Sequence, residues 1–250
     1  LIRGNVRKQM KDTVEHFKYI SVRDDWTQKM IGHITNGEIE PQVTPDPVFA
    51  INHNCTGFFP TKEDICRKFG LPGDYLLLSF KKQNGSVSAG WLDEFVSLAK
   101  EQQITCVSLP YAESENLGGV EINIPRPLSP LDWFSLIKYS QGYIGNNMHP
   151  IIVSLHNATP FFAFDNYGIV KLRGMIASNK SSKIYHIVKL AGFLSNYVYA
   201  KGKAYKAPEP QYVLKAVMDF DKDRCRQFAD NYYSLYLDMM QSVYKAIKTN

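Results

Sequence analysis

Continuous apolar segments of strand length are the feature of this sequence that most restricts its fold. Tyr75–Phe80 and Ile104–Leu109 are two of them, and each is connected to the next strand or helix by polar residues. A strand with one face in water shows alternating polar and apolar residues, so continuous apolar runs indicate strands that are buried on both faces. Helical patterns alternate with these strands along the chain. One begins at the capping-box sequence Thr61-Lys-Glu-Asp64 and is closed by Gly70, and another has Trp91, Phe95 and Leu98 on one face. The sequence therefore predicts an α/β fold: a Rossmann-like parallel sheet with helices on both faces.

The segment from Gly142 to Phe164 combines several of these signals. It reads as a strand, a tight polar turn, a helix that carries His149 near its start, and a second apolar strand. Ligands of open α/β sheets gather at the carboxyl ends of strands, where helix N-termini favour anions. His149 is therefore a candidate general acid or base, since the pKa of histidine lies near neutrality. The alternative is a structural histidine, which is the commoner role for a lone histidine.

Three further loops are predicted to meet the turn before His149 at the carboxyl edge of the sheet. They follow the predicted strands that end near Arg23, Lys81 and Phe164. Lysine and arginine bind phosphate and carboxylate groups by charge-assisted hydrogen bonds, so cations here favour an anionic substrate. For Lys81 and Lys82, a solvated surface position without a ligand is an equally good interpretation. The predicted substrate-binding residues are Arg23, Lys81, Lys82, Ser86, Asn147, Tyr167, Lys171 and Arg173.

Other functional classes lack support in the sequence. No Ser/His/Asp nucleophile pattern is visible, and neither His149 and His156 nor the four cysteines have metal-ligand spacing. We therefore predict no metal and no cofactor, and expect His156 and Cys106 to be buried core residues. The net charge of +5 (29 basic minus 24 acidic residues) is spread along the chain, and no nucleic-acid-binding motif accompanies it. No apolar segment is long enough to span a bilayer.

The two ends of the chain suggest its domain organisation. The chain begins at Leu1 in a helical pattern, so we expect an upstream segment to precede it. Residues 1–50 are predicted to be the end of an amino-terminal domain and a linker, 51–200 a Rossmann-like donor-binding domain, and 201–250 a carboxyl-terminal helical segment that packs back on the fold. A long helix from Asp221 has an apolar stripe that we interpret as packing surface. The segment from Asp165 to Gly174 is expected to be a polar loop.

Five short motifs resemble those of the polysaccharide pyruvyl transferase family and occur in the family's order. They are Ile20-Ser-Val-Arg-Asp24, Asp46-Pro-Val-Phe49, Pro127-Leu-Ser-Pro130, Gly145-Asn-Asn-Met-His-Pro150 and Tyr167–Lys171. The resemblance runs from about Tyr19 to Val198 and covers the carboxyl-terminal domain and the end of the preceding one. It implies a two-domain fold like that of the glycosyltransferase-B enzymes.

The resemblance also implies an activity. Members of the family transfer the enolpyruvyl unit of phosphoenolpyruvate to a sugar and leave a pyruvate ketal on a polysaccharide or its lipid-linked precursor. The implied partners are phosphoenolpyruvate and a sugar or lipid-linked oligosaccharide. The implied location is the cytoplasm, with peripheral association at the inner face of the membrane.

The chain departs from the family pattern in two places. The glycine-rich motif expected near the start of the family is not in this sequence, and the family's arginine two positions before the motif histidine is Asn147. That arginine is expected to bind charged groups of the donor, and asparagine carries no charge. Two alternatives to pyruvyl transfer therefore stay open: a glycosyltransferase that uses a nucleotide-sugar donor, and a catalytically degenerate binding protein in glycan assembly.

Overall fold

The computed structural model describes residues 4–80, 85–110 and 117–248, without the side chain of Arg173. The chain divides into two compact units. The larger unit is Asn52–Ala229, and the smaller unit combines Leu1–Ile51 with Asp230–Asn250. The candidate site lies in the larger unit, so that unit is described first.

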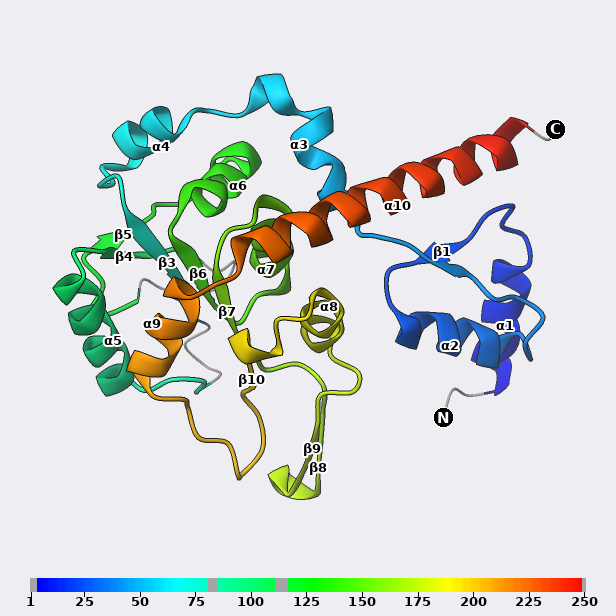
Figure 1. The fold of residues 1–250 in the computed structure, drawn as a ribbon. Helices are drawn as coiled ribbons and strands as arrows, with labels where there is room; N and C mark the ends of the chain where they lie inside the picture. Colours follow the sequence, from blue (N-terminus) through cyan, green and yellow to red (C-terminus); the bar gives the residue numbers. More distant parts are fainter. Residues whose placement is uncertain (1–3, 81–84, 111–116, 249–250) are drawn as a thin grey trace. The chain divides into compact units, whose positions relative to one another are not determined.

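A six-stranded parallel sheet forms the centre of the larger unit (Figure 1). Its strands, in chain order, are β3 (Tyr75–Ser79), β4 (Thr105–Ser108), β5 (Ile122–Asn123), β6 (Gly142–Gly145), β7 (Phe161–Asp165) and β10 (Tyr197–Tyr199). Their spatial order is β10-β7-β6-β3-β4-β5, and every neighbouring pair is parallel. Numbered along the chain, this is the 3-2-1-4-5-6 order of the doubly wound fold. The predicted α/β, Rossmann-like class is confirmed.

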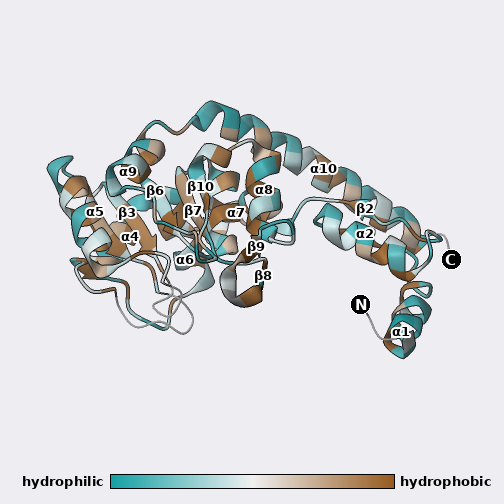
Figure 2. Ribbon diagram, turned by 90° about the horizontal axis from the view of Figure 1, so that it is seen from below, coloured by the Kyte–Doolittle hydropathy of each residue, from teal (hydrophilic) through white to brown (hydrophobic). Residues whose placement is uncertain are grey.

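Helices cover both faces of this sheet, as the continuous apolar strands predicted (Figure 1). On one face, α5 (Ala89–Glu101) packs against α9 (Pro210–Met218). On the other lie α6 (Pro130–Tyr139), α7 (Met148–Asn157) and α8 (Lys183–Ala191), with α7 between α6 and α8. The central strands are the most apolar part of the unit in Figure 2, and every residue of β3, β6 and β7 is buried.

Aromatic side chains fill the space between the sheet and the α5–α9 layer. Trp91 stacks on Phe95 within α5 at a centroid distance of 5.3 Å, and the ring of Trp91 also contacts Phe80, just after β3, and Phe164 in β7. All four belong to one buried cluster. Aromatic rings bury more apolar area than other side chains and so contribute strongly to such a core. The predicted helix face with Trp91 and Phe95 is confirmed, and Cys106 is buried as expected.

Helix α4 (Lys62–Phe69) begins and ends where local sequence signals place it. The Thr61 hydroxyl accepts from the Asp64 N–H, and the Asp64 carboxylate accepts from the Thr61 N–H, which forms the predicted capping box. Gly70 ends the helix in the left-handed conformation at φ 62°. The remaining short elements of this unit are α3 (Ile51–Asn54), η2 (Thr56–Phe58), η4 (Leu172–Gly174) and η5 (Leu194–Asn196).

The segment after β7 differs from the expected polar loop. It forms an antiparallel hairpin of β8 (Ile169–Lys171) and β9 (Ile176–Ser178), with Ile169 paired to Ser178 and Lys171 to Ile176. The prediction of a loop was wrong because the polar residues flank a short β-branched pair, Ile169-Val170, that favours extended backbone. Both side chains are exposed, so the usual signal of a buried strand is missing.

The smaller unit contains α1 (Gly4–Val14), β1 (Ser21–Val22), α2 (Asp25–Ile34), β2 (Gln42–Val43) and η1 (Pro47–Ala50). Its strands form a separate two-stranded parallel sheet. Helix α10 (Lys222–Lys248) starts in the larger unit and contributes its residues from Asp230 onward to this one. There, the ring of Tyr232 lies 5.0 Å from that of Phe49, and Met239 is buried. The apolar stripe of α10 is thus packing surface, as predicted. Within the described ranges, no helix combines the length and apolar character that a membrane crossing needs.

His156 is the core histidine that the sequence predicted. Its side chain is buried at the end of α7, and Nε2 accepts a hydrogen bond of 3.2 Å from the backbone N–H of Asn52. Burial, together with the nearby His53 and Lys138, lowers the pKa of His156 to about 4. The folded protein therefore keeps this imidazole neutral, whereas the unfolded chain protonates it below its usual pKa of 6.5.

This difference predicts a pH dependence of stability. The contribution of His156 is fully present above pH 6.5 and is lost as the pH falls from 6.5 to about 4. The loss amounts to about 3 kcal/mol over the whole range and to about 2 kcal/mol by pH 5, since one pKa unit corresponds to about 1.4 kcal/mol. Urea unfolding of wild type and His156→Gln, at about pH 7.5 and about pH 5, measures it. Glutamine can still accept the Asn52 N–H but does not titrate, so the variant should lose less stability on acidification; equal losses would contradict the assignment.

Candidate active site at the carboxyl edge of the sheet

The strand order places the topological switch point of the sheet between the carboxyl ends of β3 and β6. These strands are neighbours, with Ser79 paired to Gly145. The chain leaves β3 towards α5 on one face of the sheet, and it leaves β6 towards α7 on the opposite face. Connections that diverge in this way open the crevice in which doubly wound proteins bind ligands. The Gly142–Phe164 segment, singled out from the sequence, supplies one side of it.

Gly145 allows the two strands to approach each other closely at this point. A Cβ atom at Gly145 would overlap the carbonyl oxygen of Ser79 and would lie 2.6 Å from the hydroxyl of Tyr143. Any larger residue would therefore push β6 away from β3, because real Cβ atoms do not approach backbone that closely. The glycine fixes the position from which the following polar turn starts.

Asn146 holds that turn to the segment after β3 and to strand β7. It is fully buried, and its Nδ2 donates to the Ser86 hydroxyl at 2.8 Å and to the Phe164 carbonyl at 3.0 Å. The Ser86 carbonyl in turn accepts from the hydroxyl of Tyr205 at 2.5 Å. Ser86, a predicted substrate ligand, is itself buried and part of this support. Asn146 was missed as a site residue, although its place in the Gly-Asn-Asn turn was the available signal.

Asn147 and His149 follow at the N-terminus of α7. Asn147 is the N-cap residue; its backbone N–H donates to Tyr143 Oη at 3.3 Å, and its side chain makes no capping hydrogen bond. Met148 and Pro150 are buried, whereas His149 between them is exposed. The first turn of α7 thus places an exposed imidazole beside the backbone N–H groups of Met148 and His149, which the Asn147 side chain does not cap. Such a helix start attracts anions.

Asp165 is a second residue that sequence reasoning missed. Its carboxylate is fully buried at the end of β7 and accepts from the Tyr197 hydroxyl at 2.7 Å and from the Tyr167 N–H at 2.9 Å. Asn179 donates to the oxygen of Tyr197 at 3.1 Å. Burial, with the negative charge of Asp165, raises the pKa of Tyr197, which therefore stays a neutral donor. This network fixes the base of the β8–β9 hairpin at the carboxyl edge.

The predicted cations are distributed more widely than expected. Arg23 follows β1, which belongs to the two-stranded sheet of the smaller unit, and it pairs with Asp46 at 3.1 Å. The prediction that its loop follows a strand of the main sheet is therefore wrong; the apolar residues around Val22 indicated a strand but not which sheet it joins. Lys171 is exposed at the end of β8. Lys81 and Lys82 lie outside the described residues, as does the side chain of Arg173.

The structure thus places Ser86 after β3 and Asn147 and His149 after β6, with Ser86 joined to the β6 turn through Asn146, and Tyr167 begins the segment that follows β7. This arrangement offers an exposed proton donor or acceptor, a helix N-terminus and a rigid polar support. In the part of the chain that the structure describes, no group of His, Cys, Asp or Glu side chains is placed to hold a metal ion.

The fold and this crevice define a doubly wound α/β protein of the glycosyltransferase-B-like class. The chain belongs to the polysaccharide pyruvyl transferase family, whose model matches residues 1–167. Four of the five motifs lie wholly within the match, and the fifth begins at its last residue, Tyr167. The family predicted from the motifs is therefore confirmed. No curated protein matches the chain.

Solved structures with a similar fold share little sequence with this chain. UDP-GlcNAc 2-epimerase from Methanocaldococcus jannaschii has a TM-score of 0.52 at 9% identity, covering 87% of this chain and 62% of the epimerase. The wall teichoic acid polymerase TagF has a TM-score of 0.48 at 13% identity, covering 98% of this chain and 61% of the polymerase. The chain thus spans about three fifths of the length of these proteins. The likeness to the epimerase concerns the fold alone.

Proposed function

We propose that this protein transfers the enolpyruvyl group of phosphoenolpyruvate to a sugar of a polysaccharide or its lipid-linked precursor and forms a pyruvate ketal. One observation carries the proposal: in a chain of this family, the motif residue His149 is exposed on the first turn of α7, which follows β6 at the switch point of the sheet. An imidazole that can reach solvent and a bound substrate is suited to proton transfer near neutral pH.

The reaction requires the transfer of two protons. Two sugar hydroxyls form C–O bonds to C2 of phosphoenolpyruvate, the bond from C2 to the phosphate oxygen breaks, and inorganic phosphate leaves. One hydroxyl proton, directly or by exchange, ends on the methylene carbon, which becomes the methyl group; the other leaves with phosphate. We assign to His149 the proton donation to the methylene or the removal of a hydroxyl proton.

The donor carries a phosphate and a carboxylate, and we assign groups at the carboxyl edge of the sheet to both. The N-terminus of α7 would receive one anionic group through its backbone N–H groups. Asn147 would add a neutral amide donor in place of the family's arginine. Lys81 and Lys82 on the β3 loop are proposed as cationic ligands, and Tyr167, Lys171 and Arg173 after β7 as further donor or acceptor contacts. Ser86 would act by holding Asn146.

A thermal-shift experiment distinguishes this proposal from its alternatives. Phosphoenolpyruvate at about 100 times its Kd should stabilise the protein by about 2.7 kcal/mol. A nucleoside diphosphate should have no such effect. Stabilisation by the nucleoside diphosphate alone would favour a nucleotide-sugar transferase, and stabilisation by glycan alone would favour a binding protein; either result would contradict the proposed donor.

A further inference from the structure

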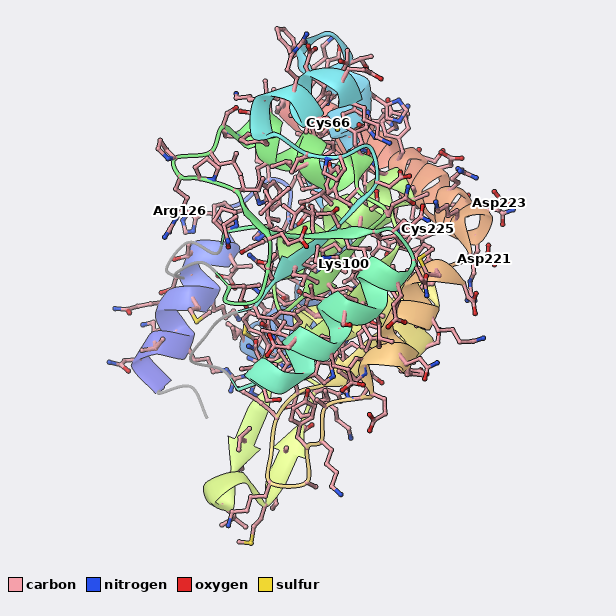
Figure 3. All side chains as sticks on the ribbon, turned by 90° about the vertical axis from the view of Figure 1, so that its left-hand side faces the viewer. Cys66, Lys100, Arg126, Asp221, Asp223 and Cys225 are labelled. Carbon is pink, nitrogen blue, oxygen red and sulfur yellow. The ribbon has the colours of Figure 1, made fainter. Side chains whose placement is uncertain are left out.

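The β8–β9 hairpin exposes an apolar surface that folding does not explain. Leu172, Met175 and Ile176 at its tip are 61%, 69% and 52% exposed, and Ile169 and Val170 are exposed beside them. In Figures 1 and 3 the hairpin extends away from the sheet, at the end of the larger unit where the carboxyl-edge loops lie, and in Figure 2 it carries apolar colouring. Clustered exposed apolar residues usually mark an interaction surface.

Polar and backbone contacts hold this hairpin in place. The Asp165–Tyr197–Asn179 network fixes its base, and the hydroxyl of Tyr199 donates to the Ser178 carbonyl at 3.0 Å. At the tip, the Lys203 N–H donates to the Gly174 carbonyl at 3.0 Å. None of these contacts uses the apolar side chains, so the apolar residues are presented on a fixed support without being needed for it.

Leu172 is the clearest example of an apolar residue that the hairpin does not need for its own stability. Its backbone lies in the left-handed region at φ 50°, which favours glycine or asparagine over leucine. Its side chain is exposed and gains no packing in return. Neither the backbone nor the core of the protein therefore calls for leucine at this position, which leaves a contact outside the protein as the reason for an apolar residue.

The charged residues of the segment that contains the hairpin favour one kind of binding partner. From Asn166 to Pro208 the chain has no Asp or Glu, and it has the basic residues Lys171, Arg173, Lys180, Lys183, Lys189, Lys201, Lys203 and Lys206. Within the described residues, none of these lysines forms an ion pair with an acidic side chain. An apolar tip in a segment that carries lysines and no acidic residue between Asn166 and Pro208 matches an anionic lipid surface: the apolar side chains would enter the headgroup boundary and the lysines would meet the lipid charges.

We propose that the β8–β9 hairpin, with the adjoining loop 201–206, docks the protein on an anionic lipid bilayer. The same loop region reaches the candidate site, because Tyr205 donates to the Ser86 carbonyl at 2.5 Å while Lys203 binds Gly174 at the hairpin tip. Docking through this surface brings the crevice loops next to the bilayer, where a lipid-linked sugar is presented. A membrane-bound acceptor rests on the proposed function, but docking itself does not.

Vesicle sedimentation tests the docking without donor or acceptor, so its result is independent of pyruvyl transfer. The protein should sediment with phosphatidylcholine vesicles that contain phosphatidylglycerol, and much less with phosphatidylcholine alone. Leu172→Asn/Met175→Ser/Ile176→Ser should weaken binding by about tenfold or more. Lys201→Gln/Lys203→Gln should weaken it by about fivefold per charge. Phe58→Ser is the matched control: Phe58 is 73% exposed in η2, which belongs to no part of the proposed surface, and its removal should leave binding unchanged.

Folding of the variants can be checked separately. Because asparagine suits a positive φ better than leucine, Leu172→Asn alone should keep or raise the melting temperature while it lowers vesicle binding. A tryptophan placed at Ile176 should be quenched by brominated lipid, and one placed at Phe58 should not. Wild-type protein that stays in the supernatant with anionic vesicles would overturn the proposal. So would a folded hairpin variant that sediments like wild type, since the binding surface would then lie elsewhere.

Discussion

Replacement of His149 by alanine is expected to lower the rate of phosphate release from phosphoenolpyruvate by about 10²–10⁴-fold, the usual contribution of a general acid or base. The fold should be unaffected, because the His149 side chain is exposed and packs into no core. The melting temperature and the affinity for phosphoenolpyruvate should therefore stay near those of wild type. Steady-state assays with the acceptor, together with calorimetry of donor binding, measure the two effects separately.

His33→Ala provides the matched control. His33 is also an exposed helical histidine, in α2 of the smaller unit, and no role in the reaction is proposed for it. Its removal should leave the rate unchanged. If His149→Ala kept full activity, the proton-transfer role assigned to His149 would be wrong, whatever the protein's substrate.

Replacement of Asn147 by arginine is expected to tighten phosphoenolpyruvate binding by about 10- to 100-fold. A hydrogen bond from a charged group contributes about 1.5–3 kcal/mol, and the side chain at position 147 starts beside the N-terminus of α7, where a bound anion would lie. The half-buried Asn147 makes no capping bond, so the exchange removes no capping contact. Isothermal titration with phosphoenolpyruvate measures the change.

Asn147→Gln is the control for size, because it lengthens the side chain without adding charge. It should bind phosphoenolpyruvate about as wild type does, and the gain with arginine should shrink as salt is added. An unchanged affinity in Asn147→Arg would contradict the placement of position 147 at the donor's charged groups. It would indicate that another cation on the crevice loops already occupies that role.

Much of the fold could be predicted because its signals are local. Continuous apolar strands predicted a parallel sheet, and the Thr61–Asp64 capping box and Gly70 predicted where α4 begins and ends. The assignment of β1 to a sheet is a long-range property, which is why Arg23 was expected at the wrong sheet edge. The hairpin was missed because its apolar side chains face solvent and so break the pattern by which strands are recognised.

The distinction between local and long-range signals also explains which site residues could be predicted. His149 was found because a strand, a polar turn and a helix start follow one another in sequence. Asn146 and Asp165 were not found, because their roles depend on partners far along the chain: Ser86 lies 60 residues from Asn146, and Tyr197 lies 32 residues from Asp165. Hydrogen bonds between residues so far apart in the sequence can be recognised only when the structure shows which strands are neighbours.

The central claim is that this member of the pyruvyl transferase family uses phosphoenolpyruvate as its donor. The most direct test incubates the protein with phosphoenolpyruvate and a panel of polysaccharides and lipid-linked sugars. Phosphate release and the product's mass and methyl resonance are then followed together. We predict phosphate release that depends on one acceptor and matches, one for one, the appearance of a pyruvate ketal methyl group. Phosphoenolpyruvate that stays intact with every acceptor, while a nucleotide-sugar donor is consumed, would contradict the claim.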